Sequence, residues 1–184
     1  MHICSGRREE PWRGLLAGLI SGVAATIAMS MFQSAWNATT QRRFPSKNNS
    51  DALARCPSPQ PNDVETTRML VDRVAVLGGF EFSDAALAET ALALHYGIGA
   101  AGAYAYFLFR NVALPRFHKE HPLLTGAVFG AAFFLTADLA VLPLLGFPNK
   151  GSRSPLGTQF YGFSSHVVYG VTAAATCNLV GKFL

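Results

Sequence analysis

Residues 15–22 (LLAGLISG) and residues 123–130 (LLTGAVFG) share one pattern of leucines and glycines. Each of these stretches is followed by a histidine-containing stretch that ends in glycine. Residues 95–99 (HYGIG) follow the first, and residues 166–170 (HVVYG) follow the second. Such self-similarity indicates that one structural unit occurs twice in the chain. We therefore predict two helical hairpins of the same design, in which the two histidines occupy matching positions.

The composition favours a membrane protein. Of the 184 residues, 50% are hydrophobic and 14% are charged, with a mean hydropathy of +0.24. A transmembrane helix needs about 20 apolar residues, and the runs lack the alternation of barrel strands. We predict an all-α, four-transmembrane-helix bundle built from two repeated hairpins, forming a single integral-membrane domain over residues 1–184. The predicted spans are residues 12–33, 87–110, 123–147 and 160–182.

Residues 34–86 form a polar loop with one predicted helix at about residues 62–78. The helix begins at an Asn-Asp cap and ends at a glycine pair. Its apolar positions have the spacing of a short amphipathic helix. These positions are Val64, Met69, Leu70, Val74 and Leu77. We expect this helix to cover the mouth of the bundle as an interfacial or docking helix.

The basic residues lie beside and between the predicted spans. Arginines before the first apolar run resemble the start of a secretory signal peptide. The run is longer than the usual apolar core of a signal peptide, however, and it has a counterpart at residues 123–147. We therefore expect the first apolar run to be retained in the mature protein. The excess of Lys and Arg in the N-terminal tail and middle loop places both termini in the cytoplasm. With no basic stripe interleaved with aromatic residues, the chain is expected to contact the lipid bilayer and not nucleic acid.

Glycines recur along the predicted spans at helical spacing. Small residues let membrane helices approach closely, within one chain or between two copies. The predicted helix-packing glycines are Gly14, Gly18, Gly22, Gly99, Gly126, Gly130 and Gly170. They also favour a homo-oligomer or a membrane-protein partner.

Four polar residues fall at comparable depth in the four spans: Ser30, His95, Asp138 and His166. Ionisable groups within a membrane are costly and usually face the interior of the bundle. Pro143 is expected to kink the end of the third span and tilt Asp138 inward. The layer is either a hydrogen-bonded core that fixes helix register or a proton relay.

Two hypotheses of cofactor binding also fit these residue types. His95 and His166 can ligate a haem iron axially, and with Asp138 they offer three ligands for a metal ion. The spacing matches no metal signature, however, and the three cysteines form no recognisable cluster. Nucleophile-elbow and phosphate-loop motifs are also missing from the sequence. The sequence therefore favours a non-enzymatic protein with no catalytic residue, no metal and no cofactor.

Several short motifs resemble those of the YagU-like group of small bacterial inner-membrane proteins. The motifs are the glycine-rich first span, NDVETTR at residues 62–68, HYxxG at residues 95–99, LPLLG at residues 142–146 and HxxYG at residues 166–170. The resemblance implies a multi-pass protein of the bacterial inner membrane. It implies no biochemical activity.

We predict that the buried His/Asp layer supports proton-linked or small-solute passage across the membrane. The alternative, from a different functional class, is a structural or accessory subunit that docks to a larger membrane complex through its glycine faces.

Overall fold

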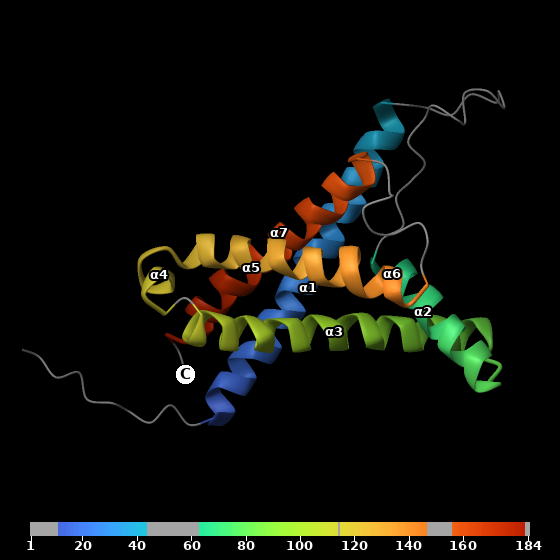
Figure 1. Cartoon of the computed structure of the whole chain (residues 1–184), viewed down its shortest axis with the longest axis horizontal. Coiled ribbons are helices and arrows are strands. Elements are labelled where there is room, and N and C mark those ends of the chain that lie inside the picture. The colour runs from blue at the N-terminus through green and yellow to red at the C-terminus, as the bar shows by residue number, and fades with distance from the viewer. Residues whose placement is uncertain (1–10, 44–62, 114, 147–155, 183–184) are drawn as a thin grey trace, which may run out of the picture.

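The computed structural model describes residues 11–43, 63–113, 115–146 and 156–182, and these residues form helices without any strand. The predicted all-α class is therefore confirmed. The elements are α1 (Pro11–Arg43), α2 (Asp63–Gly78), α3 (Asp84–Val112), α4 (Pro115–Glu120), α5 (Pro122–Thr136), the π-helical η1 (Ala137–Val141), α6 (Leu142–Leu144) and α7 (Leu156–Val180) (Figure 1).

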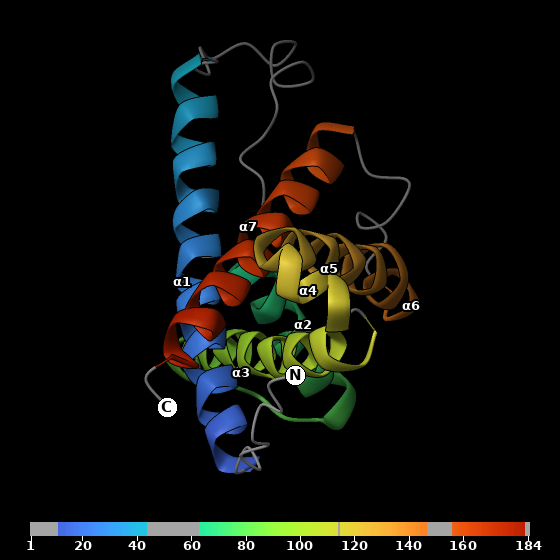
Figure 2. The same ribbon diagram turned by 90° about the vertical axis from the view of Figure 1, so that its left-hand side faces the viewer.

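The long helices are arranged in two layers. α1 and α7 run side by side in opposite directions and cross α3 and α5 obliquely (Figures 1 and 2). α3 packs on α1, α1 on α7 and α7 on α5, whereas α3 and α5 make few direct contacts. The start of α1 and the end of α7 lie at the end of the molecule that carries α4, and α2 lies at the opposite end beside α6.

Within the part of the chain that the structure describes, three helical segments are long and apolar enough to cross a membrane: Leu16–Thr40, Asp84–Val112 and Pro122–Leu144. They coincide with the first three predicted spans. The fourth predicted span falls in α7, which is not among these segments. α7 is more polar, and it packs against both α1 and α5, burying a continuous row of small and polar residues.

The predicted polar loop is wrong in its first part, because α1 continues through residues 34–43. The hydroxyls of Ser34 and Thr39 donate to carbonyls one turn back, at 2.9 and 2.7 Å, so both polar side chains are hydrogen-bonded within the helix. Trp36 lies 6.0 Å from the ring of Phe160 and holds this part of α1 against α7. The predicted loop at residues 44–62 lies outside the described residues.

The predicted loop helix is present as α2, but its packed side differs from the apolar pattern. Thr66, Thr67, Val71 and Ala75 are buried. The predicted apolar residues Met69, Val74 and Leu77 are exposed instead. α2 ends at Gly78, and the next residue, Gly79, has a φ of 71°, the left-handed conformation typical of the position after a helix C-terminus. α2 therefore packs through its small and hydroxyl side chains.

Glycines mark the points where helices approach most closely. A Cβ added to Gly22 of α1 would lie 2.6 Å from the Cα of Ala100 in α3. A Cβ on Gly130 of α5 would lie 2.2 Å from the His166 carbonyl oxygen in α7. Gly99, Gly126 and Gly170 also face neighbouring helices at short distance, and Gly18 faces Tyr104 at 3.7 Å. The surroundings of Gly14 lie outside the described side chains.

Candidate functional site

A cavity of about 350 Å³ lies where the two layers meet and α2 covers them. His95 from α3, Asp138 from η1 and His166 from α7 all line it, with exposed fractions of 7%, 7% and 6%. The other lining residues are mainly apolar: Thr26, Met29, Thr66, Thr67, Leu70, Ile98, Gly99, Phe133, Thr136, Ala137, Val141, Leu142, Leu145 and Tyr169. The structure thus brings together the three ionisable residues named from the sequence.

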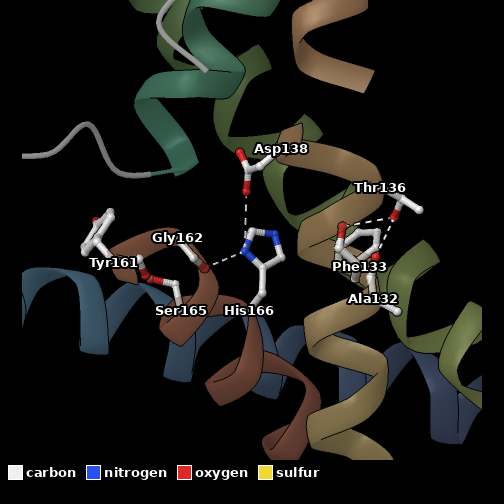
Figure 3. A network of polar contacts seen from close by, with 8 residues as sticks. All are labelled: Ala132, Phe133, Thr136, Asp138, Tyr161, Gly162, Ser165 and His166. Carbon is white, nitrogen blue, oxygen red and sulfur yellow. Dashed lines mark hydrogen bonds and ion pairs between the residues drawn. The ribbon is translucent and has the colours of Figure 1, made fainter. Parts of the chain in front are cut away.

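A π-helical turn places Asp138 in the cavity wall. Pro143 has no amide hydrogen with which to continue the α-helical ladder. The preceding residue, Leu142, donates its amide hydrogen to the carbonyl of Ala137, five residues back. Just before this turn, the Thr136 hydroxyl bonds to the carbonyls of Ala132 and Phe133, both at 3.0 Å (Figure 3). The kink predicted at Pro143 therefore takes the form of a wider turn, a feature frequently found at functional sites.

Asp138 faces His166 across the gap between η1 and α7 (Figure 3). The Nδ1 atom of His166 lies 3.5 Å from an Asp138 carboxylate oxygen and 2.9 Å from the carbonyl oxygen of Gly162. Both neighbours are hydrogen-bond acceptors, so we assign the hydrogen to Nδ1. The Nε2 atom, on the other side of the ring, is then the position at which His166 gains or loses a proton.

His95 has a comparable partner in α1. The Oγ atom of Ser30 lies 3.4 Å from the Nε2 atom of His95, and the Tyr96 ring stands edge-on to the imidazole at 5.7 Å. Ser30 supports His95 from behind and is not among the cavity-lining residues. Three of the four predicted layer residues therefore line the cavity, and the fourth, Ser30, contacts one of them.

Tyr169 joins the two layers beside the cavity. Its hydroxyl donates a hydrogen bond to the carbonyl oxygen of Gly99 in α3, and its side chain is buried. A Cβ at Gly102 would lie 2.8 Å from this hydroxyl, so a glycine is needed there to admit the tyrosine. This bond fixes α7 against α3, although the two helices otherwise touch little.

α2 forms the cover of the cavity. Thr66, Thr67 and Leu70 line its inner side. Arg68 pairs with Asp84 at the start of α3, at 3.2 Å, while Arg73 donates to the carbonyl of Gly146 after α6, at 2.8 Å. These contacts tie α2 to the two helices that flank the cavity.

Sequence reasoning did not identify Thr26, Thr66, Thr67 and Phe133 as cavity residues. Threonine is common on both buried and exposed helix faces, so the α2 threonines carry no distinctive pattern. The predicted position of residues 62–78 at the bundle mouth was the useful signal. Phe133 was hidden within an apolar run, where the sequence does not say which side faces a cavity.

A second polar cluster lies at the opposite end of the molecule. The buried Tyr106 hydroxyl lies 3.4 Å from Nδ1 of His118 in α4. Arg110 places its guanidinium 4.8 Å from the centre of the Phe107 ring. Partial burial, and secondly the positive charge of Arg110, lower the pKa of His118 below its ordinary value.

Within the described residues, no group of three or more His, Cys, Asp or Glu side chains has an arrangement that could hold a metal ion. No family model, curated protein or solved structure significantly matches the chain. The function must therefore be argued from the geometry of the cavity itself.

Proposed function

We propose that this protein is a four-span membrane protein that passes a small solute through the cavity in a step linked to proton binding. The observation that carries the proposal is that His95, Asp138 and His166 come from three different helical elements and share one cavity. Its volume of about 350 Å³ is within the range of about 300–1,000 Å³ typical of small-molecule sites. Buried ionisable residues in membrane helices commonly mark solute or proton pathways.

The proposal counts α7 as the fourth span. α7 has 25 residues and contains no Asp, Glu, Lys or Arg. At about 1.5 Å per residue it is long enough for a hydrocarbon core of about 30 Å. Its serines, histidine and tyrosines are largely buried against other helices. Enclosure by α1 and α5 is compatible with a polar span, since lipid contacts only a part of its surface.

We also propose that both termini are cytoplasmic. The end of the molecule that carries the start of α1 and the end of α7 also carries Arg110, Arg116 and Lys119. Arg13 lies at that end too, whereas the opposite end has Arg42, Arg43, Arg68 and Arg73, the last two in the long connection between α1 and α3, which weighs less in orientation. The positive-inside rule therefore favours the α4 end as the cytoplasmic one.

The proposed internal repeat is supported by matching contacts. Gly22 packs against α3 at Gly99 and Ala100, and its counterpart Gly130 packs against α7 close to Gly170, the counterpart of Gly99. The polar pairs also correspond. Ser30 faces His95 at 3.4 Å, and at the equivalent positions Asp138 faces His166 at 3.5 Å.

A proton-linked step is chemically reasonable at the second of these pairs. His166 can carry a proton on Nε2 while its Nδ1 hydrogen points toward Asp138 and Gly162. The resulting imidazolium is stabilised by the carboxylate, and when the proton leaves, a neutral imidazole stands beside the charged carboxylate. His95 lines the same cavity and offers a second imidazole.

On the basis of the sequence motifs, we also propose that the protein belongs to the YagU-like group and lies in the bacterial inner membrane. Association with a second copy or a membrane partner is supported by the many large apolar side chains exposed on α1, α3 and α5. An accessory-subunit role would have to use these surfaces, since Gly22, Gly99, Gly126, Gly130 and Gly170 pack against helices of the same chain.

The test is proton flux in liposomes that contain the purified full-length protein. We expect flux to rise above that of protein-free vesicles and to be lost in Asp138→Asn and His166→Gln. The matched control is Glu89→Gln, the same carboxylate-to-amide change at an exposed position of α3. Folded Asp138 and His166 variants with wild-type flux at every pH would refute the proposal.

A further inference from the structure

We infer that the cavity takes a small, largely apolar molecule carrying a protonated amine, and that this cation displaces one proton from His166. The inference rests on the function proposed above and names its substrate class. It follows from the charges that face the cavity, from the character of its walls and from the position of the aromatic rings.

Four titratable side chains of the described residues line the cavity: Asp138 from η1, His95 from α3, and His166 and Tyr169 from α7. The described lining side chains from α1, α2, α5 and α6 are uncharged. A buried carboxylate is stable only with a compensating positive charge. A proton on His166 supplies that charge when the cavity is empty, and a cationic ligand supplies it when the cavity is filled.

The walls favour an organic cation over a metal ion. Met29, Leu70, Ile98 and Leu142 present apolar surface to the cavity, which cannot replace the water around an inorganic ion. Hard metal ions need about six oxygen ligands, and the described residues contain no metal-holding cluster. An apolar body with a single charged end matches both the walls and the carboxylate.

The aromatic rings indicate where the charged end lies. The centre of the Phe133 ring lies 5.6 Å from the centre of the His166 ring and 6.0 Å from that of the Tyr169 ring. Both Phe133 and Tyr169 line the cavity. Ring faces attract organic ammonium groups. A primary ammonium at Asp138 donates N–H bonds to the carboxylate and leaves its apolar body against the apolar walls of the cavity, which include Phe133.

The exchange conserves charge. One ammonium enters, one proton leaves Nε2 of His166, and the Nδ1 hydrogen stays on the ring toward Asp138 and Gly162. No bond within the ligand is broken. Amine binding and protonation of His166 are therefore competitive, so the affinity for the amine rises with pH by at most about tenfold per pH unit.

The probe is benzylammonium, with benzyl alcohol as the neutral ligand of similar size. Binding to the full-length protein in nanodiscs is measured by titration calorimetry, repeated in buffers of different ionisation enthalpy so that released protons are counted. We expect benzylammonium to bind at least about tenfold more tightly than benzyl alcohol and to release up to one proton. Asp138→Asn should abolish this preference, and Glu89→Gln should preserve it.

Phe133→Leu is the second variant, and it tests the inferred amine binding if Asp138→Asn does not fold. We expect it to weaken benzylammonium binding by about threefold to tenfold and to change benzyl alcohol binding less. Equal affinity for the two probes, binding without proton release, or no binding of either probe would overturn the inference. None of these results depends on transport, so wild-type flux with failed amine binding would leave the proposed function standing and reject only this ligand class.

Discussion

The contact between α5 and α7 at Gly130 can be tested with a matched pair of glycine substitutions. In Gly130→Ala the new Cβ would lie 2.2 Å from the His166 carbonyl oxygen and 2.8 Å from the carbonyl carbon. In Gly97→Ala, on α3, the new Cβ would meet nothing within 4 Å. Both changes replace a helical glycine by alanine, so they differ mainly in what the methyl group encounters.

The expected difference in stability follows from these distances. Ordinary van der Waals contact begins near 3.4 Å, so α5 and α7 must separate by about 1 Å to admit the methyl group at Gly130. Overpacking of this kind typically costs about 1–3 kcal/mol. The gain in helix propensity, about 1 kcal/mol, is common to both variants. Gly97→Ala should therefore be more stable than wild type, and Gly130→Ala less stable than Gly97→Ala by about 1–3 kcal/mol.

The assay is reversible unfolding in mixed detergent micelles, followed by far-ultraviolet circular dichroism and extrapolated to zero denaturant. Gly157→Ala is a second control, because its added Cβ would also meet nothing within 4 Å. If Gly130→Ala were as stable as both controls, α5 and α7 could not approach at this point. The placement of His166 in the cavity would then also be wrong.

Three further substitutions test other contacts. Tyr169→Phe removes the hydrogen bond to the Gly99 carbonyl and should lower the free energy of unfolding by about 1–3 kcal/mol, whereas the same change at exposed Tyr104 should alter it by less than about 0.5 kcal/mol; equal effects in the same unfolding assay would contradict the bond. The lowered pKa of His118 means that the unfolded state binds more protons, so stability should fall as the pH drops below about 6.5. His118→Asn should flatten that part of the pH profile, and an unchanged profile would exclude His118 as its source. Arg73→Ala should loosen α2 and raise the hydrogen-exchange rate of α2 amides, with an unaltered rate arguing against its role in holding the cover.

The positions of the helices were predictable to different degrees. Apolar runs located the three helical segments that are long and apolar enough to cross a membrane, and the cap and glycine pair located α2, because these signals are local. The end of α1 was not predictable from hydropathy, since Ser34 and Thr39 read as loop residues. In the structure their hydroxyls bond to carbonyls of the preceding turn, and the helix continues through polar sequence.

The candidate site was predictable in its residues but not in its geometry. Matched depth in four apolar runs was enough to group Ser30, His95, Asp138 and His166, since depth follows directly from residue number along a helix. The oblique crossing of the two layers and the cover formed by α2 depend on contacts between distant segments. The π-helical turn depends on how Pro143 is accommodated, and a proline alone indicates only that a helix is disturbed.

The two polar pairs suggest why the proposed repeat would be asymmetric in its chemistry. Under the proposed repeat, Ser30 and Asp138 are equivalent positions opposite His95 and His166, and of these two residues only Asp138 supplies a carboxylate to the cavity. A second carboxylate at position 30, beside His95, would repel that of Asp138 within the same buried polar layer and favour the protonated form of one of them. One carboxylate with two imidazoles instead holds a single exchangeable positive charge. The serine therefore completes the support of His95 without adding a second charge, which is what a one-for-one exchange of proton and cation requires.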